Sequence, residues 1–309
     1  MEEKILVTGG AGFIGSHSTE ALLSCGYKVR IIDNFSSGDR DNLPAHANLE
    51  IIEGDIREPQ SLRRAMSGVT KCLHLAAQVS VAHSVEEPCD SAENNIMGTL
   101  RVLEAARDHG VARVVYASSA AVYGEPENLP LTEAARLSPL SPYGLEKWVN
   151  ERYASLFKEL HGLSSLGLRY FNVYGPRQSP TSPYAGVITR FVDRLRVGQA
   201  PTIYGDGKQT RDFIYVADVA RFNVLALFAD QNGVCNVASQ CSTSLLQLVE
   251  ALQFGLGSHV SPHLNEPRGE DIRHSLGSAE RLVDWLGEAP LYTLDEGLEA
   301  YLADMKLAR

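Results

Sequence analysis

A glycine-rich turn between a strand and a helix constrains the fold of this chain more than any other feature. Residues 4–8 (KILVT) are typical of a short buried strand, and TGGAGFIG follows at residues 8–15. Gly9, Gly12 and Gly15 have the spacing G-x-x-G-x-x-G. Glycines permit a tight turn and let backbone amides approach a pyrophosphate at a helix N-terminus. The motif therefore predicts a dinucleotide-binding strand–turn–helix unit.

The first half of the chain alternates short apolar runs with helix-like stretches. The runs lie at residues 4–8, 29–32, 49–52, 71–75, 113–117 and 165–169. They are mostly too short and too uniformly apolar for half-exposed hairpins. The clearest helical stretches between them are 94–109 and 142–161. This alternation predicts an α/β fold whose doubly wound parallel sheet is covered by helices on both faces.

The pattern loosens after residue 170 into Pro/Gly-rich loops around helices such as 187–197 and 243–254. We therefore expect residues 1–170 to form a dinucleotide-binding domain and residues 171–309 to form a smaller lobe. The chain is expected to cross between the two.

Composition argues against several classes of protein. The 309 residues are 44% hydrophobic and 21% charged, as in ordinary globular proteins, and the net charge of -10 argues against a nucleic-acid surface. The five cysteines are odd in number and never spaced C-x-x-C, which indicates reduced thiols in a cytoplasmic protein and no zinc site. The charged start argues against a signal peptide, and the absence of a long apolar run argues against a membrane-spanning segment.

Asp33 stands at the end of the second predicted strand. A carboxylate there can accept hydrogen bonds from the adenosine ribose hydroxyls and would repel a 2′-phosphate. No Arg follows until Arg40, which also favours NAD over NADP. The alternative is that Asp33 only caps the next helix.

Two pairs of polar residues are candidate site residues, one pair after the fifth predicted strand and the other at the start of the long predicted helix. Ser118 and Ser119, in ASSAAVYG, follow the strand end where ligands of doubly wound sheets bind. Tyr143 and Lys147, in SPYGLEK, are four residues apart and so share one helix face. The Lys charge is expected to favour phenolate and lower the Tyr pKa towards neutrality, giving a general acid/base. The alternative is a helix with one buried aromatic and one solvated lysine.

Together TGGAGFIG, ASSAAVYG and SPYGLEK resemble the extended short-chain dehydrogenase/reductase family, specifically its nucleotide-sugar 4-epimerases. The likeness runs from about residue 4 to about residue 300. It implies a Rossmann-type domain with tightly held NAD, a smaller α/β C-terminal lobe for a UDP-sugar, and a homodimer packed through helices 94–109 and 142–161. The resemblance implies cofactor contacts from Gly9, Gly12, Phe13, Ile14, Gly15, Asp33, Asn34, Asp55, Ile56, Leu75, Ala76, Ala77, Asn94, Tyr143, Lys147 and Tyr170.

Related dehydratases and decarboxylases carry a carboxyl group in the segment that matches residues 118–121. Here that segment is SSAA, which argues against elimination chemistry. The resemblance then implies reversible hydride transfer at the sugar C4. Tyr143 would remove the C4 hydroxyl proton, Ser119 would hydrogen-bond to that oxygen, and Lys147 would hold the nicotinamide ribose and stabilise the phenolate.

The second half matches the family's nucleotide-sugar contacts. The resemblance implies substrate contacts from Ser80, Ser119, Tyr143, Asn172, Val187, Tyr204, Arg211, Arg268, Asp271 and Ser275. Asn172 and Arg211 match contacts to the phosphates, Arg268 matches a phosphate and uridine clamp, and Tyr204 matches an aromatic against the uracil. Asp271 matches the carboxylate paired with the nucleotide ribose. The usual Arg-x-Gly-Asp order is replaced here by Arg-Gly-Glu-Asp, so a different local turn is expected.

Ser275 occupies a position that is usually a bulky Tyr in epimerases restricted to UDP-glucose and UDP-galactose. A small residue there leaves room for an acetamido group, and DIRHSL resembles bacterial epimerases of UDP-GlcNAc and UDP-GalNAc. The N-acetylated substrates are therefore expected, and their products could supply polysaccharide biosynthesis. The alternatives are the plain hexoses, UDP-glucuronate, a net UDP-sugar oxidoreductase, and an NAD-binding sensor without catalysis.

Overall fold

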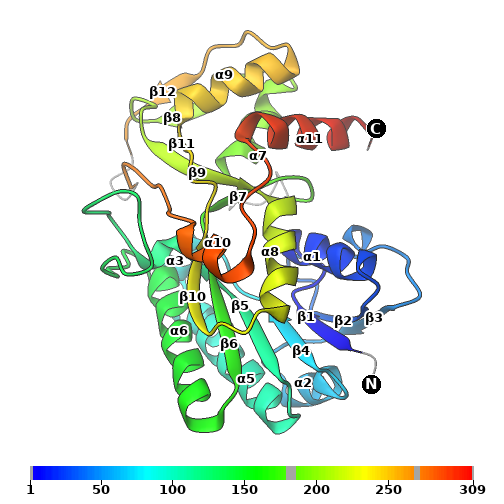
Figure 1. Ribbon diagram of the computed structural model, residues 1–309. Coiled ribbons are helices and arrows are strands. Elements are labelled where there is room, and N and C mark those ends of the chain that lie inside the picture. The colour runs from blue at the N-terminus through cyan, green and yellow to red at the C-terminus, as the bar shows by residue number, and fades with distance from the viewer. Residues whose placement is uncertain (1–2, 179–185, 268–271, 308–309) are drawn as a thin grey trace.

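A computed structural model of the chain describes residues 3–178, 186–267 and 272–307, so Arg268 and Asp271 lie outside the described residues. Among the described residues, seven parallel strands form one sheet in the order β10-β6-β5-β4-β1-β2-β3 (Figure 1). They are β1 (Lys4–Thr8), β2 (Lys28–Asp33), β3 (Leu49–Glu53), β4 (Lys71–His74), β5 (Arg113–Ser119), β6 (Ser164–Tyr170) and β10 (Gly233–Val237). The predicted doubly wound parallel sheet is confirmed.

Helices cover both faces of this sheet, which explains why its strands are apolar at nearly every position. Ile5 and Val7 of β1 join one core with residues of α1 (Phe13–Ser24) and α8 (Val216–Phe228). Leu6 joins the opposite core with residues of the helices on the other face. Those helices are α2 (Pro59–Met66), α5 (Gly98–Asp108) and α6 (Pro142–His161). Because alternate side chains of a strand point to opposite faces, two covered faces require an uninterrupted apolar run.

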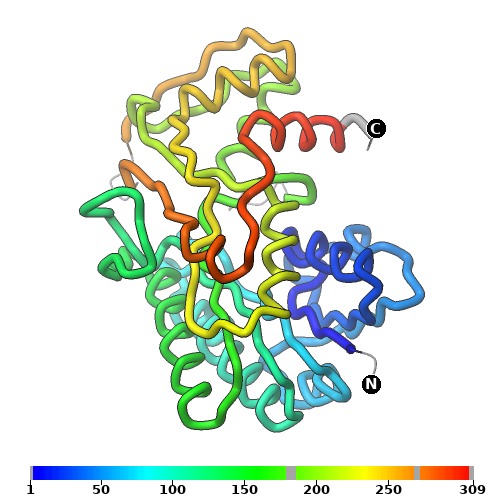
Figure 2. Tube along the Cα trace, viewed as in Figure 1, coloured from blue at the N-terminus to red at the C-terminus, as the bar shows by residue number. Residues whose placement is uncertain are grey.

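The chain returns to the sheet after it has entered the second lobe. β6 leads directly into β7 (Asn172–Tyr174), which belongs to a different sheet. Helix α8 then packs against α1, and β10 pairs with β6 at the edge of the large sheet. Figure 2 shows this return in yellow, beneath the second lobe. Residues 216–237 therefore pack with the first 170 residues, as part of the large sheet and the helices that cover it.

The long helix α6 has the predicted bounds because local signals mark both of its ends. The Ser141 side chain accepts a hydrogen bond from the Gly144 amide, and Pro142 occupies the first turn. At the other end Gly162 adopts a left-handed conformation with φ 71°.

The predicted helix 94–109 is wrong at its start. After the short helix α3 (Val81–Glu86), continuous helical structure begins at Pro88 with α4 (Pro88–Ala92). It continues through a π-helical turn, η2 (Glu93–Met97), and ends in α5. Pro88 at the first position of α4 marks a start that apolar periodicity did not reveal. A π turn contains more residues than an α turn, so it also breaks the 3.6-residue pattern.

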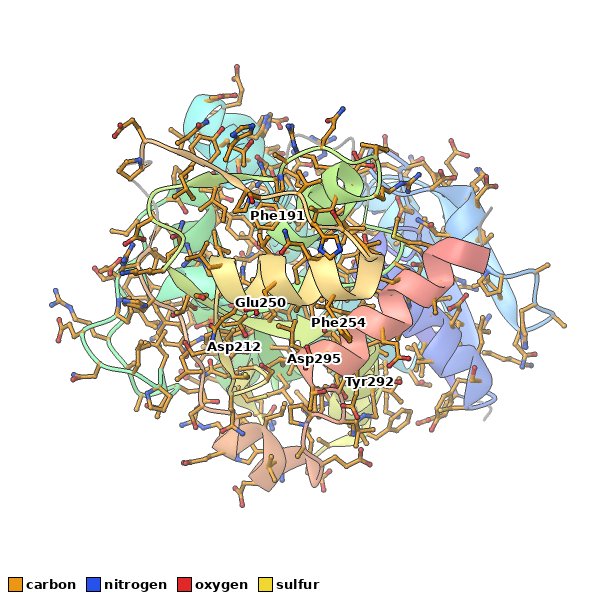
Figure 3. The ribbon with its side chains drawn as sticks, turned by 90° about the horizontal axis from the view of Figure 1, so that it is seen from above. Phe191, Asp212, Glu250, Phe254, Tyr292 and Asp295 are labelled. Carbon is orange, nitrogen blue, oxygen red and sulfur yellow. The ribbon has the colours of Figure 1, made fainter. Side chains whose placement is uncertain are left out.

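The second lobe is built from two small sheets and three helices among the described residues. The strands are β7, β9 (Thr210–Tyr215) and β11 (Ser242–Ser244) in one sheet, and β8 (Thr202–Tyr204) and β12 (His263–Asn265) in the other. The helices are α7 (Val187–Leu195), α9 (Leu245–Leu256) and α11 (Leu294–Leu307), whereas α10 (Glu280–Leu286) packs against β10 and α8 of the large sheet. Helices α9 and α11 lie side by side across the top of the molecule (Figure 3), and with α7 they enclose an apolar core.

Short 3₁₀ turns complete the described chain at η1 (Arg40–Asn42) and η3 (Ala120–Val122). No helix in the described ranges has the combined length and apolar character needed to cross a membrane.

Candidate active site

The glycine turn after β1 has no room for side chains. Gly9 has φ +68°, and a Cβ there would lie 2.8 Å from the Ala76 backbone. A Cβ on Gly15 would lie 2.0 Å from the Gly9 carbonyl oxygen. Gly12 is the N-cap of α1, so Phe13, Ile14 and Gly15 form its first turn. The turn thus leaves a bare backbone at a helix N-terminus, which fits a pyrophosphate.

Asp33 lies against this turn and is only 8% exposed. One carboxylate oxygen accepts a hydrogen bond from the Ala11 amide at 2.9 Å, and the other accepts from the Phe35 amide at 2.8 Å. The next helical turn, η1, is capped by Asp39. The alternative in which Asp33 only caps the next helix is therefore wrong.

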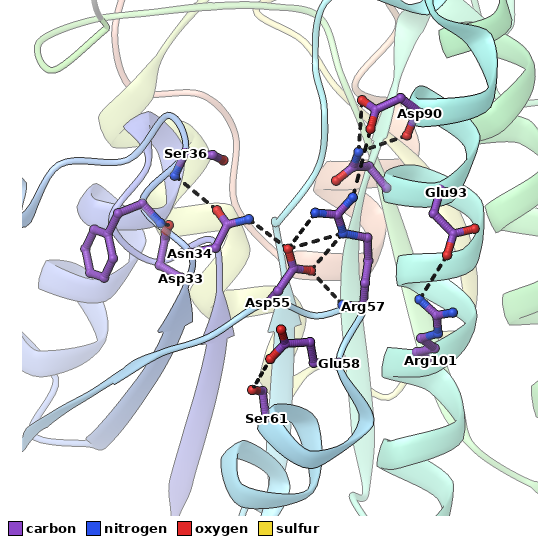
Figure 4. Close-up of polar contacts among 12 residues, drawn as sticks. Asp33, Asn34, Ser36, Asp55, Arg57, Glu58, Ser61, Asp90, Glu93 and Arg101 are labelled. Atoms are coloured by element: carbon purple, nitrogen blue, oxygen red, sulfur yellow. Dashed lines mark hydrogen bonds and ion pairs between the residues drawn. The ribbon is translucent and has the colours of Figure 1, made fainter.

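Asn34 and Asp55 extend the same edge of the sheet beyond β2 and β3 (Figure 4). The Asn34 amide donates to Asp55 at 3.0 Å, and the Arg57 guanidinium donates to both oxygens of Asp55. The Arg57 hydrogen bonds lower the pKa of Asp55 to about 2 in spite of partial burial. Ile56 is buried in the core beside α5, where a Cβ on Gly98 would lie 2.7 Å from its Cδ1 atom.

The loop after β4 is held by hydrogen bonds to Thr8, which is itself hydrogen-bonded to a buried histidine. Leu75 and Ala76 donate their backbone amides to the Thr8 hydroxyl at 3.2 and 3.1 Å. Thr8 in turn is 2.7 Å from Nδ1 of His74, whose Nε2 is 3.0 Å from the Thr99 hydroxyl. Burial lowers the pKa of His74 to about 3, so the imidazole is neutral. The loop with Leu75, Ala76 and Ala77 thus meets the glycine turn.

Ser119, Tyr143 and Lys147 come together at the carboxyl end of β5. Ser119 hydrogen-bonds to the Tyr143 hydroxyl. The Lys147 ammonium donates to the Ala117 carbonyl at 3.1 Å and lies 5.6 Å from the centre of the Tyr143 ring. The geometry therefore brings one phenol, one hydroxyl and one ammonium together at the carboxyl end of β5, on the same edge of the sheet as the glycine turn.

Gly144 lets the start of α6 approach this strand end. A Cβ on Gly144 would lie 2.6 Å from the Ala121 carbonyl oxygen. The Tyr143 amide donates to the Ser84 hydroxyl at 3.1 Å, which fixes the same turn from the other side. A side chain at residue 144 would therefore push Tyr143 away from Ser119.

The expected lowering of the Tyr143 pKa is wrong for the chain alone. Burial is the largest influence and raises the pKa of Tyr143 to about 12, although the Ser119 hydrogen bond opposes it. Burial also lowers the pKa of Lys147 to about 8. Removing both groups from water disfavours both charged forms, and this effect is the largest influence on each of the two pKa values.

Three of the expected ligand contacts have their polar groups already engaged within the chain. The Asn94 amide donates to the backbone and side chain of Asp90. The Ser80 hydroxyl caps α3 by accepting from the His83 amide, and the Tyr170 hydroxyl donates to Asn223 at 2.6 Å.

The substrate-side residues gather around strand β9. Arg211 lies on this strand, and Asn172 begins β7, which pairs with β9 in parallel. The Ser275 amide donates to the Thr210 carbonyl at 3.1 Å, so Ser275 runs beside Arg211. The Tyr204 carbonyl, at the end of β8, accepts from Gln209 at 2.7 Å.

Val187 opens α7 and packs at the margin of the second-lobe core. Arg268 and Asp271 again lie outside the described residues.

Sequence reasoning missed several residues that hold the site together. Glu146 and Asn95 are 3% and 1% exposed and hydrogen-bond to each other, and Gly144 and His74 act as described above. Asp212 is fully buried and accepts from the Gly277 amide at 3.1 Å, which anchors the segment that carries Ser275. The glycine inside SPYGLEK was the one available signal, since a glycine near a helix start often marks a close approach of two backbones.

Comparison with known proteins agrees with this geometry. The model of the NAD dependent epimerase/dehydratase family matches residues 5–238. A protein of Methanocaldococcus jannaschii named putative UDP-glucose 4-epimerase is 41% identical, with 98% of both chains covered. A UDP-N-acetylglucosamine 4-epimerase from Methanobrevibacter ruminantium, solved with UDP-N-acetylmuramic acid, has a TM-score of 0.96 at 40% identity over 100% of both chains. The Thermus thermophilus UDP-glucose 4-epimerase in complex with NAD has a TM-score of 0.90 at 36% identity, covering 99% of this chain and all of the other.

The fold and site thus define an NAD-binding enzyme of the extended short-chain dehydrogenase/reductase type. The chain belongs to the NAD-dependent epimerase/dehydratase family, and within it to the NAD-dependent UDP-sugar 4-epimerases.

Proposed function

We propose that this enzyme interconverts UDP-N-acetylglucosamine and UDP-N-acetylgalactosamine by epimerisation at C4. The observation that carries the choice of sugar is the small, half-buried Ser275 beside Arg211 on the substrate side of the site. The likeness to a UDP-N-acetylglucosamine 4-epimerase over the whole chain supports it.

The residues of the first lobe fit NAD. The bare glycine turn would hold the pyrophosphate, Asp33 would meet the adenosine ribose, and Lys147 would meet the nicotinamide ribose. Asp33 leaves no suitable place for a 2′-phosphate, because its buried carboxylate is negative and Arg40 is paired with Glu53. When bound, NAD would supply a hydride acceptor for the hydrogen on the sugar C4.

Tyr143 is the acid/base in this proposal. It takes the proton from the C4 hydroxyl as the carbonyl forms and gives a proton back when the alcohol is restored. Ser119, already hydrogen-bonded to Tyr143, holds the same sugar oxygen. Because burial keeps Tyr143 neutral in the chain alone, the positive charges near it must favour the phenolate during the reaction. Lys147 provides one such charge.

The plain hexoses are the second candidate, because the relatives include proteins named UDP-glucose 4-epimerases. UDP-glucuronate is less well supported by the site. His83 is the basic side chain within residues 78–84, and its Nε2 is 2.9 Å from the Asp90 carboxylate. It is therefore engaged and poorly placed to receive a sugar carboxylate.

Product analysis tests the proposal directly. The purified enzyme is incubated with each UDP-sugar in turn, and the C4 epimers are separated by chromatography. We expect interconversion of the two N-acetylated sugars, with the enzyme-bound NAD unchanged at the end. Conversion of the plain hexoses alone would overturn the choice of substrate, and conversion of none would overturn the function.

Replacing Ser275 with tyrosine is expected to reduce the N-acetylhexosamine reaction more than the hexose reaction. A bulky ring would fill the space for the acetamido group, and such steric discrimination is worth about tenfold or more in kcat/KM. The measurement is kcat/KM on all four sugars. Ser275→Ala is the matched control and should preserve both reactions. Equal losses on both classes of sugar in Ser275→Tyr would contradict the proposal that the size of residue 275 selects the substrate.

We also propose a homodimer packed through α6 and the neighbouring η2–α5 segment. Leu145, Leu156 and Leu160 of α6 are 47%, 41% and 71% exposed, and Met97 of η2 is 38% exposed. A second copy would cover this apolar face. Light scattering should give twice the 33.7 kDa chain mass. Leu160→Glu should shift the mass towards the monomer, and an unchanged dimer in that variant would place the interface elsewhere.

A further inference from the structure

Glu146 is a buried acid that the proposed chemistry does not use. It lies on α6 between Tyr143 and Lys147 and is 3% exposed. One of its oxygens, Oε2, accepts hydrogen bonds from the Ser91 hydroxyl at 2.9 Å and from the Asn95 amide at 2.6 Å. Both donors are neutral. A buried carboxylate is costly to keep, so its presence beside two reacting groups calls for a reason.

The Asn95 side chain connects this acid to the loop after β4. Its Oδ1 accepts from the Gln78 amide and its Nδ2 donates to the Gln78 carbonyl, both at 2.9 Å. Asn95 is 1% exposed and lies in the π-helical turn η2, a type of turn that is frequent at functional sites. Asn150 of α6 donates to the Asn95 carbonyl at 3.1 Å. Glu146 is thereby tied to the segment that runs from Ala76 to Ser80.

The charge of Glu146 also acts on both reacting groups. It raises the pKa of Lys147, against the larger effect of burial, and it raises the pKa of Tyr143, in the same direction as burial. The other groups facing Lys147 are the Ala117 carbonyl of β5 and the neutral His74 of β4.

Tyr143 also faces Ser119, together with the phenol of Tyr170 on β6. The groups other than Glu146 that face the two reacting residues are thus neutral at pH 7. Among the described residues that act on this pair, Glu146 is therefore the one that carries a negative charge.

We propose that Glu146 is a positioning residue for the epimerase reaction, which anchors the 76–80 loop through Asn95 and balances the charge of Lys147. The inference rests on the proposed function. Loop anchoring and charge balance are separable, because a single oxygen of Glu146 accepts both hydrogen bonds.

Glu146→Gln separates the two roles. An amide oxygen can replace Oε2 and keep both hydrogen bonds, while the charge is lost. Without the negative charge the pKa values of Tyr143 and Lys147 both fall. We therefore expect both limbs of the pH profile of kcat to move to lower pH, by on the order of one unit. The melting temperature and the NAD content of the purified protein should stay close to those of the wild type.

Asn95→Ala makes the complementary change, since it removes the loop contact and leaves the charge. It should raise KM and weaken NAD retention without moving the two pH limbs. Glu159→Gln is the matched control, because Glu159 is an exposed acid on the same helix. It should change neither the profile nor KM.

A readout without turnover distinguishes failure of this inference from failure of the proposed function. Tyrosinate absorbance of the holoenzyme, with that of the Tyr143→Phe variant subtracted, follows the ionisation of Tyr143 alone. Glu146→Gln should move this titration to lower pH even if no UDP-sugar is converted. An unmoved titration in a folded, NAD-containing Glu146→Gln protein would overturn the charge role. If Glu146→Gln does not fold, an Asn95→Ala variant with normal KM and NAD content would overturn the anchoring role.

Discussion

Replacing Tyr143 with phenylalanine is expected to lower kcat by about 10²–10⁴-fold while NAD stays bound, as general acid–base groups contribute on this scale. The substitution removes one hydroxyl from the point where Ser119 and Lys147 converge and leaves the ring in place. NAD retention should persist because the glycine turn and Asp33 are untouched. The measurement is steady-state turnover of the preferred UDP-sugar, together with the NAD content of the purified protein.

Tyr153→Phe is the matched control for this variant. Tyr153 lies on the same helix, where it packs at the edge of the core between α2 and α5. Loss of its hydroxyl should leave turnover close to the wild-type value. A Tyr143→Phe enzyme with more than about a tenth of wild-type turnover would exclude the acid/base role, because so small a loss lies below that range.

Replacing Arg169 with methionine is expected to destabilise the fold by about 3–5 kcal/mol, since it leaves a buried carboxylate without its cation. The Glu151 carboxylate accepts from Arg169 Nε at 2.8 Å and from Nη2 at 2.6 Å, and both side chains are at most 6% exposed. The same carboxylate accepts from the Ser118 hydroxyl at 2.6 Å. The pair therefore joins α6, β5 and β6 directly beneath the catalytic groups.

The midpoint of urea unfolding measures this loss. Arg136→Met is the matched control, since Arg136 and Glu127 form an exposed pair and exposed pairs contribute little. The double variant Glu151→Leu/Arg169→Met removes the unpaired charge and should recover much of the stability. A double variant no more stable than Arg169→Met would show that the uncompensated carboxylate is not the cause.

Much of the first lobe was predictable because its signals are local. The glycine spacing requires a tight turn whether or not the rest of the chain is known, and a Cβ on Gly15 would meet the Gly9 carbonyl. The apolar run KILVT requires a strand covered on both faces. Helix α6 has its predicted bounds because Ser141 and Gly162 mark its ends within the helix's own backbone.

Other parts depended on contacts between distant residues. Asn95 and Glu146 are 51 residues apart in sequence, and Asn95 and Gln78 are 17 apart, so no local pattern reveals their hydrogen bonds. The return of β10 to the edge of the large sheet likewise follows from its pairing with β6, whose partner residues lie 67 positions earlier in the chain. The start of the helical segment at Pro88 was missed because the π turn η2 disrupts the apolar period.

The chain's own sequence determined the dinucleotide turn, the parallel sheet and the order of Ser119, Tyr143 and Lys147, because short-range backbone geometry and strand burial suffice for these. Only the tertiary structure decided the protonation of the site. The pKa of Tyr143 rises and that of Lys147 falls because segments far apart in sequence enclose both groups and exclude water. The exclusion of water depends on all of these neighbours together. The seven residues of SPYGLEK therefore cannot reveal it by themselves.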